Sequence, residues 1–144
     1  MTEYFAYGAN MDAAQMAGRC PGARRLETAG LAGYAFGIGA GGYGTAVPAP
    51  GGSVHGVLWR LTPEDEAALD RFEEVDRGFY RKRSVRVTTA SGDRVEAMIY
   101  HAADPSPGIP APGYLERILE LAEALGFPED YTSGLRAWLP PARS

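Results

Sequence analysis

The sequence predicts an α+β fold, a small mixed, mostly antiparallel β-barrel flanked by helices. Its 144 residues suit a single domain over residues 1–144, and its 45% hydrophobic content is enough to form one core. The segments that favour strands and helices do not alternate regularly, which disfavours a doubly wound parallel sheet. The 19 glycines and 11 prolines favour many turns over long helices.

The first predicted element is a short strand, which a tight turn connects to a helix. Residues 4–7 are rich in aromatic side chains, which favour β-structure, and the run ends at Gly8. Asp12 can cap a helix, so we expect a short helix over residues 12–17.

The next part of the chain predicts two strands separated by a long loop. Residues 26–38 are apolar but interrupted by glycines, which favours a strand with bends. Residues 39–52 predict a loop that contains only a brief strand at 45–47. Residues 54–61 form a mainly apolar run and predict a buried strand.

A helix is predicted directly after this buried strand. Thr62 can cap the helix, and Pro63 suits its first position. The acidic pair that follows suits the positive end of the helix dipole. The helix should end at Phe72 or Glu73, and its apolar face should consist of Ala68, Leu69 and Phe72.

The C-terminal part predicts a hairpin and two helices. Residues 80–89 and 94–101 alternate between apolar and polar side chains and are joined by a short polar turn, which is typical of an antiparallel hairpin. Residues 104–113 are rich in proline and glycine and predict a loop. Amphipathic spacing predicts a helix over residues 114–125, and a last short helix follows over residues 128–139.

Charge and cysteine content argue against several classes of function. The formal net charge is -4, from 18 acidic and 14 basic residues, which disfavours nucleic-acid and anionic-membrane partners. The single cysteine and two histidines cannot form an internal disulfide or the usual four-ligand zinc site, so we expect no metal. The sequence shows no signal-like segment and no membrane-spanning apolar segment, which predicts a cytoplasmic protein.

A glycine-rich run at residues 37–42 matches the G-x-G-x-x-G pattern of dinucleotide sites. That pattern requires a helix directly after it, which residues 43–48 do not favour. We therefore interpret the run as a loop and nucleotide binding as a minor alternative. His55 and His101 lie in predicted strands without metal-like spacing, so they are expected to be packed or edge histidines. Cys20 has no base near it in the sequence, so it is expected to be a buried small residue and not a nucleophile.

Two other features are candidates for a functional site. The first is the strand-to-helix turn at residues 7–10. Successive backbone N–H groups at such a turn can point into one concavity and hold a carboxylate or an oxyanion. A turn with only a structural role is the alternative.

The second feature is the acidic segment at the end of the predicted helix. Glu73 lies where the negative end of the helix dipole disfavours a further negative charge. Three acidic residues lie near it in the sequence: Asp70, Glu74 and Asp76. Partial burial of its carboxyl would raise the pKa of Glu73, which suits a general acid and base near neutral pH. A solvated acidic helix end is an equal alternative.

Together these two features resemble the motifs of the γ-glutamylcyclotransferases, in the AIG2-like superfamily. Residues 4–10, YFAYGAN, resemble the YFAYGSN opening of that family. Residues 69–80 resemble its LDxxEGVxxGxY segment. Shorter matches extend the likeness over nearly the whole chain in the same order, at residues 54–59, 110–114 and 126–131.

The resemblance implies the small barrel of that family and its reaction. The free α-amino group of a γ-glutamyl amide attacks the γ-carbonyl, which releases 5-oxoproline and an amine. The substrate carries the nucleophile, so the resemblance implies no cofactor. It implies a small-molecule γ-glutamyl partner and no particular oligomeric state. The leaving group could be an amino acid, an amine or a larger biosynthetic intermediate, and we expect residues 39–52 and 104–113 to select among them.

The resemblance also assigns roles to individual residues. Glu73 would carry out both proton transfers. The backbone amides of Gly8, Ala9 and Asn10 would bind the oxygens of the γ-glutamyl group. Three further residues match positions that line the family's site and could donate hydrogen bonds: Tyr7, Tyr80 and Tyr114.

The chain departs from the family pattern at two positions. Ala9 replaces the usual serine, which removes a hydroxyl but keeps the backbone amide. Glu74 replaces the glycine that usually follows the catalytic glutamate, which adds a negative charge and restricts the backbone. The alternative to an enzyme is therefore a non-catalytic member that binds a small carboxylate or a peptide terminus in the same pocket.

Overall fold

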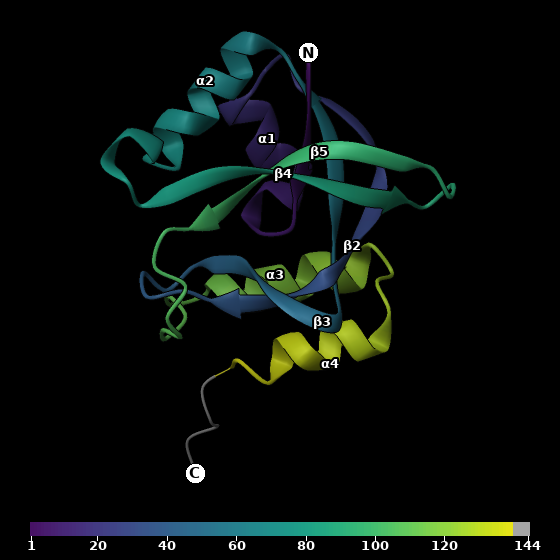
Figure 1. Ribbon diagram of the computed structural model, residues 1–144, viewed down its shortest axis with the longest axis vertical. Coiled ribbons are helices and arrows are strands. Elements are labelled where there is room, and N and C mark those ends of the chain that lie inside the picture. Colours follow the sequence, from purple (N-terminus) through teal and green to yellow (C-terminus); the bar gives the residue numbers. More distant parts are fainter. Residues whose placement is uncertain (140–144) are drawn as a thin grey trace.

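A computed structural model describes residues 1–139, in which five strands close into a barrel (Figure 1). Residues 140–144 of the predicted domain lie outside this description. Neighbouring strands are antiparallel, except that β5 pairs with β1 in parallel and so closes the ring. The predicted mixed, mostly antiparallel barrel is confirmed. In the order β1-β3-β2-β4-β5, the strands are β1 (Thr2–Ala6), β3 (Gly44–Leu61), β2 (Arg24–Ile38), β4 (Tyr80–Thr89) and β5 (Arg94–Ala102).

Short helices flank the barrel at both ends of the view in Figure 1, with α1 and α2 near the N-terminus and α3 and α4 beside β2 and β3. Within residues 1–139, none of them is long and apolar enough to span a membrane. The bounds of α1, α2 and α3 were predicted to within two residues, whereas the last helix ends three residues earlier than predicted, at Arg136 rather than near residue 139. Their bounds are α1 (Ala13–Arg19), α2 (Pro63–Phe72), α3 (Tyr114–Ala124) and α4 (Glu129–Arg136), with 3₁₀ turns η1 (Ala9–Met11) and η2 (Val75–Arg77).

The predicted helix starts are confirmed by their capping bonds. The carboxylate of Asp12 accepts a hydrogen bond from the Ala14 N–H at 3.0 Å at the start of α1. At the start of α2, the Thr62 hydroxyl accepts from the Asp65 N–H at 3.1 Å, and Asp65 accepts from the Thr62 N–H in return. This reciprocal capping box satisfies backbone donors that the first turn of a helix leaves without partners.

The predicted loop over residues 39–52 is wrong, because β3 already begins at Gly44. Only residues 39–43 remain as a turn, and β2 pairs with β3 on both sides of a register shift between Ala32 and Tyr34. The prolines and glycines of residues 48–52 lie at this irregularity, where a strand tolerates them. Of the glycine-rich run at residues 37–42, only residues 39–42 form a loop, because Gly37 and Ile38 end β2. A strand, β3, follows the run where a dinucleotide site requires a helix, which argues against such a site.

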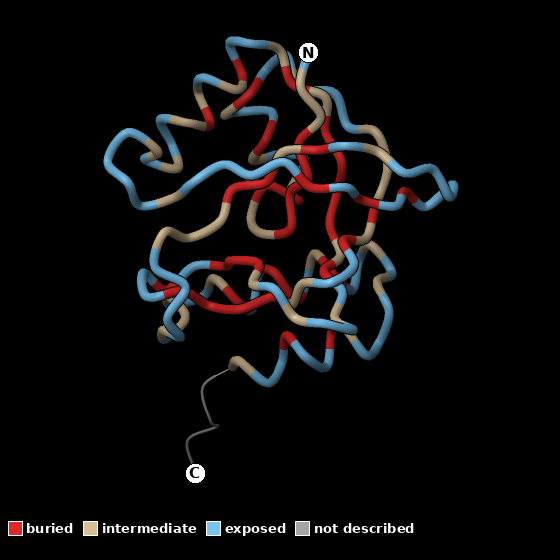
Figure 2. Tube along the Cα trace, in the orientation of Figure 1, coloured by how far each residue is buried: buried red, intermediate tan, exposed pale blue. Residues whose placement is uncertain are grey.

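The core occupies the interior of the barrel, where the buried segments in Figure 2 concentrate. The apolar side of α3 packs against this core as its spacing predicted. Leu69 is fully buried on α2, but Phe72 is 51% exposed, so its predicted place on the apolar face is wrong. Cys20 is buried at the end of α1, as expected. The largest fully buried side chains of the strands are Phe5, Ile38, Leu58, Leu61 and Ile99.

Candidate active site

One cavity of about 900 Å³ brings together all seven residues that the sequence predicted for the site. Its wall comes from the turn after β1, the hairpin between β2 and β3, the end of α2 and the start of α3. These segments are far apart in the sequence. The seven predicted residues on the wall are Tyr7, Gly8, Ala9, Asn10, Glu73, Tyr80 and Tyr114.

The turn after β1 offers backbone N–H groups to the cavity. The Met11 N–H donates to the Gly8 carbonyl at 3.0 Å, and the Asp12 N–H donates to the Ala9 carbonyl at 3.1 Å. In such a 3₁₀ turn the N–H groups before the first bonded donor have no acceptor within the turn. No side chain of the described residues caps this end. The amides of residues 8–10 are therefore available for the oxygens of a ligand.

The buried side chain of Asn10 fixes the position of this turn. Its Nδ2 donates to the hydroxyl of Tyr4 at 3.0 Å, and its Oδ1 accepts from Arg19 Nη1 at 2.7 Å. The Asn10 carbonyl also accepts from Trp59 Nε1 at 3.1 Å. Asn10 is 4% exposed, so these bonds form in a low-dielectric environment that strengthens them. The side chain of Asn10 therefore orients the turn, while the backbone N–H of Asn10 remains available to a ligand.

Close contacts also explain why the cavity has glycine at positions 8 and 44. A Cβ atom on either residue would lie 2.8 Å from the hydroxyl oxygen of Tyr114. That hydroxyl accepts a hydrogen bond from the Gly44 N–H at 3.0 Å, which leaves its own proton for a ligand. The Tyr80 hydroxyl donates to the Gly44 carbonyl at 3.3 Å. One residue of the hairpin thus fixes two tyrosines of the wall.

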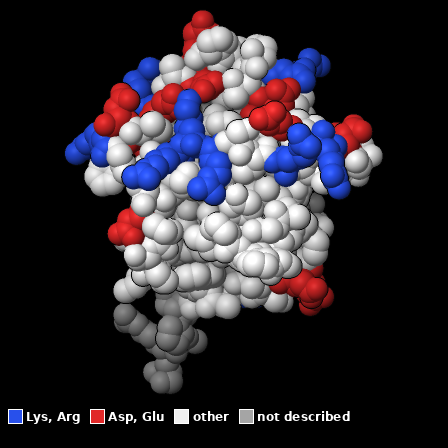
Figure 3. Space-filling view, viewed as in Figure 1, with Lys and Arg blue, Asp and Glu red and all other residues white. Residues whose placement is uncertain are grey.

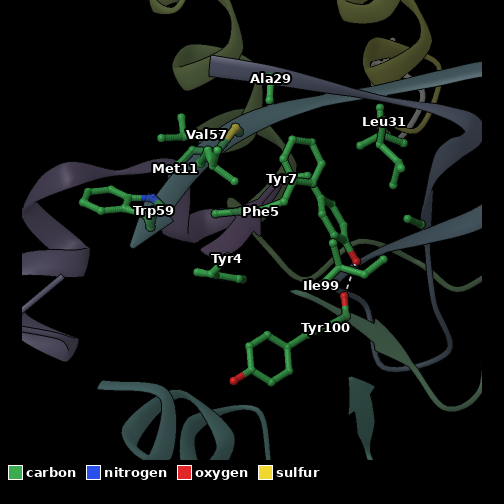
Figure 4. Close-up of a cluster of buried hydrophobic side chains, with 14 of the residues drawn as sticks. Tyr4, Phe5, Tyr7, Met11, Ala29, Leu31, Val57, Trp59, Ile99 and Tyr100 are labelled. Carbon is green, nitrogen blue, oxygen red and sulfur yellow. Dashed lines mark hydrogen bonds between the residues drawn. The ribbon is translucent and has the colours of Figure 1, made fainter. Parts of the chain in front are cut away.

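Tyr7 differs from the other two tyrosines, because it donates its only hydroxyl proton inside the barrel. The acceptor is the Tyr100 carbonyl at 2.5 Å, marked by a dashed line in Figure 4. The ring also packs edge-on against Phe36, with ring centroids 6.3 Å apart. Burial raises the pKa of Tyr7 well above its usual value. Tyr7 therefore anchors the turn and is not a free hydrogen-bond donor, contrary to the sequence expectation.

Glu73 ends α2 with a half-buried carboxyl group. Burial raises the pKa of Glu73 to about 7, and the nearby positive charge of Arg19 opposes this shift. The direction agrees with the sequence expectation, but the cause is desolvation and not the acidic neighbours. Asp70, one of those neighbours, already accepts hydrogen bonds from Tyr100 Oη at 2.6 Å and Lys82 Nζ at 3.1 Å.

Two strands hold α2, and hence Glu73, in place. Lys82 on β4 lies 2.6 Å from the carboxylate of Glu66 and 3.1 Å from that of Asp70. Figure 3 shows acidic and basic side chains side by side in this region. The bond from Tyr100 on β5 to Asp70 adds a second attachment. Exposed ion pairs contribute little to stability on their own. Together with the partly buried hydrogen bond from Tyr100 to Asp70, they fix α2 relative to the cavity.

Arg19 is the one basic residue of the described cavity wall, and sequence reasoning missed it. It lies in the last turn of α1, with its guanidinium carbon 3.4 Å from the ring centroid of Phe72. This stacking explains why Phe72 is not in the core. No carboxylate among residues 1–139 lies within 4.0 Å of its guanidinium nitrogens, so a positive charge faces the cavity without an ion-pair partner. The sequence signal that could have identified Arg19 was its position as a basic residue at the end of the short helix that follows the turn.

The remaining candidate residues of the sequence lie outside this site. The ring of His55 packs against Phe127 and Tyr131, with centroids 5.6 and 4.9 Å away. Burial raises the pKa of Cys20 to about 11, so its thiol is protonated at neutral pH and is a poor nucleophile. Residues 1–139 contain no group of three or more histidine, cysteine, aspartate or glutamate side chains that could hold a metal ion.

Comparisons with known proteins agree with the fold. γ-Glutamylcyclotransferases of mouse (Mus musculus) and human (Homo sapiens) are each 29% identical, over 95% of this chain and 78% of theirs. A solved γ-glutamyl cyclotransferase structure is similar with a TM-score of 0.87 and 27% identity, over 99% of this chain and 90% of that one. YkqA from Bacillus subtilis, at 24% identity, shares the fold with a TM-score of 0.78 over 94% of this chain and 53% of that one.

The model of the AIG2-like family matches residues 53–135. This range contains Glu73, both of the tyrosines that bind Gly44, and the helices α2 and α3. Together with the barrel and the relatives above, this match shows that the chain belongs to the AIG2-like family.

Proposed function

We propose that this protein is a γ-glutamylcyclotransferase, which converts a γ-glutamyl amide to 5-oxoproline and a free amine. One observation carries the proposal: a half-buried carboxyl with a pKa of about 7 shares a cavity with the backbone donors of residues 8–10. A group with such a pKa can both accept and donate a proton at neutral pH. The names of the relatives support the same class of reaction.

In the proposed reaction Glu73 moves the protons. An α-amino group has a pKa of about 8, close to that of Glu73, so the carboxylate can accept its proton and free the nitrogen lone pair. The nitrogen then bonds to the γ-carbonyl carbon, and the bond from that carbon to the leaving nitrogen breaks. The attacking nitrogen loses two protons in becoming the lactam N–H, and the leaving nitrogen gains two in becoming an ammonium. Glu73 would relay these protons from one nitrogen to the other.

The rest of the cavity supplies charge stabilisation and orientation. The amides of residues 8–10 would bind the developing oxyanion or the substrate carboxylate, and an oxyanion donor contributes about 3 kcal/mol. Arg19 supplies the positive charge for a carboxylate. The free proton of the Tyr114 hydroxyl can bind a further oxygen. Holding the chain folded for ring closure provides additional acceleration through orientation.

The proposal is tested by incubating the protein with a panel of γ-glutamyl amino acids and γ-glutamylamines and measuring 5-oxoproline. We expect product from at least one of them. Glu73→Gln should lower kcat by about 10²- to 10⁴-fold, because general acid–base catalysis contributes that much. Asp76→Asn is the matched control, since it removes an exposed carboxylate three residues away that does not line the cavity.

Circular dichroism should show that both variants keep the fold, so that a loss of activity reports on chemistry. Folded wild-type protein that yields no 5-oxoproline from any member of the panel would refute the proposal. Ligand binding without product, equal in wild type and Glu73→Gln, would instead identify the non-catalytic binding protein.

A further inference from the structure

The outer end of the cavity is aromatic. The described residues expose five large hydrophobic side chains, and three of them line this cavity: Tyr43, Phe72 and Phe79, at 51%, 51% and 54% exposure. Tyr43 lies in the β2–β3 turn and Phe79 directly before β4, whereas Phe72 at the end of α2 has one ring face covered by Arg19 and lies where the aromatic end meets the charged inner end. Exposed apolar side chains that gather at one cavity indicate a surface that binds an apolar ligand.

The charges at this outer end are negative. Glu74 and Asp104 are exposed residues of the wall, and none of the exposed wall residues is basic. Arg77 lies nearby, 5.4 Å from the ring centroid of Phe79, but it is paired with Glu74 at 3.1 Å. Asp104 forms no ion pair within residues 1–139. A second carboxylate would therefore meet an uncompensated negative charge here.

The inner end offers positive charge for one carboxylate. Arg19 is the single basic residue of the described wall, and it lies beside Glu73 and the turn at residues 8–10. Every γ-glutamyl amide carries one carboxylate on its glutamyl part. A γ-glutamyl amino acid carries a second one on its leaving group, whereas a γ-glutamylamine does not.

We propose that the outer end of the cavity binds the leaving group, and that it selects γ-glutamyl amides of apolar or aromatic amines that carry no carboxylate. This inference rests on the proposed function and names its substrate class. The aromatic side chains would contact the body of the amine, and Asp104 would disfavour the carboxylate of an amino acid.

The test compares two substrates that differ only in this carboxylate, γ-glutamylphenethylamine and γ-glutamylphenylalanine. We expect kcat/KM to be at least about tenfold higher for the first, and the ratio to narrow at high salt, which screens exposed charges. Asp104→Asn should lower the ratio of the two kcat/KM values by about threefold or more. Asp93→Asn, which changes an exposed carboxylate outside the cavity, is the matched control and should keep the wild-type ratio.

A second pair tests the apolar contacts. We expect γ-glutamylphenethylamine to exceed γ-glutamylmethylamine by about tenfold or more in kcat/KM, and Phe79→Ala to narrow this difference. Equal values for the two amides in the wild-type protein would overturn the inference, because they would show that the aromatic side chains do not contact the leaving group.

Further outcomes separate this inference from the proposed function. Turnover of γ-glutamylphenylalanine that equals or exceeds that of γ-glutamylphenethylamine overturns the inference and leaves the function intact. A selective loss of γ-glutamylphenylalanine turnover in Arg77→Ala also overturns it, because Arg77 would then recognise the carboxylate. Absence of 5-oxoproline from every γ-glutamyl amide overturns both.

Discussion

At the end of α2, burial holds the carboxyl of Glu73 at a pKa of about 7, above its ordinary value of 4.5. The folded protein therefore binds this proton more tightly than the unfolded chain does. The resulting stability is fully present below pH 4.5 and is lost as the pH rises through about 7. The charged form that would accept the substrate proton is thus the form that destabilises the fold.

Replacing Glu73 by a neutral residue should stabilise the protein at pH values at which the wild-type carboxyl is charged. We expect Glu73→Gln to exceed the wild type in free energy of unfolding at pH 8 by roughly 1–3 kcal/mol, and to match it near pH 4. Urea denaturation at the two pH values measures this difference. A difference that does not change with pH would contradict the raised pKa, and Glu74→Gln controls for removing a carboxylate at this helix end.

The neighbouring residue, Glu74, adopts a backbone conformation that suits glycine. Its φ and ψ angles are 53° and 44°, and it is the one non-glycine residue of the described chain with a positive φ. Its N–H donates to the Arg71 carbonyl at 3.2 Å, a bond that ends α2. A left-handed residue at this position is a common helix ending, and glycine adopts it without the steric penalty of a Cβ atom.

Glu74→Gly should therefore raise the free energy of unfolding by about 1 kcal/mol, since relief of the left-handed strain exceeds the loss of an exposed ion pair with Arg77. Thermal and urea denaturation measure the change. Asp76→Gly, two residues along at a negative φ, should have the opposite sign, because there glycine only adds freedom to the unfolded chain. Equal effects at both positions would argue against strain at Glu74.

At the scale of elements, the cavity depends on a contact between three segments. The turn after β1, the start of β3 and the start of α3 meet at the hydroxyl of Tyr114, which lies close to Gly8 and bonds to Gly44. Neither glycine tolerates a side chain without displacing that hydroxyl. The spacing of the backbone donors from Tyr114 is consequently set by packing between elements and not within one.

This contact predicts a coupling between positions 8 and 114. Gly8→Ala should lower the free energy of unfolding by about 1–3 kcal/mol, the usual effect of overpacking, and should lower activity with it. Tyr114→Phe removes the oxygen that the new methyl group meets, so the double variant should lose less than the sum of the singles by at least about 0.5 kcal/mol. A double-mutant cycle measures this coupling, and additive losses would contradict the contact.

At the scale of the whole molecule, local sequence signals predicted the helix starts and the site residues correctly. Features that depend on contacts between distant segments could not be predicted. Asp12 and Thr62 marked helix starts because capping depends on residues within one turn. Six of the seven site residues could be chosen because they lie in two motifs that are each continuous in the sequence, and Tyr114 lies in the shorter match at residues 110–114. Neither helix capping nor a continuous motif depends on contacts with segments that are distant in the sequence.

Three features escaped the sequence for the same physical reason. Residues 44–52 carry turn-forming glycines and prolines, yet pairing with β2 makes them part of a strand. Phe72 has the spacing of a core residue, but Arg19 from α1 holds its ring at the cavity. The Tyr7 hydroxyl donates its proton to the carbonyl of Tyr100, which lies 93 residues away in the sequence on β5. In each case a partner that is remote in sequence decided the outcome over the local preference.

The hairpin turn at residues 39–43 is tied to the loop before α3, because the Ala111 N–H donates to the Gly42 carbonyl at 2.9 Å, but its tip at residues 40–41 is exposed. Ile38 and Gly44 pair directly below it, so its length does not alter the strand register on which Tyr80 and Tyr114 depend. Doubling the length of a flexible loop adds only about 0.6 kcal/mol of closure entropy. Insertions between Ala40 and Gly41 that keep the bond to Gly42 can therefore reshape the outer wall while Glu73 and the turn at residues 8–10 stay in place, which makes this tip a suitable position for engineering new substrate preferences on the same barrel.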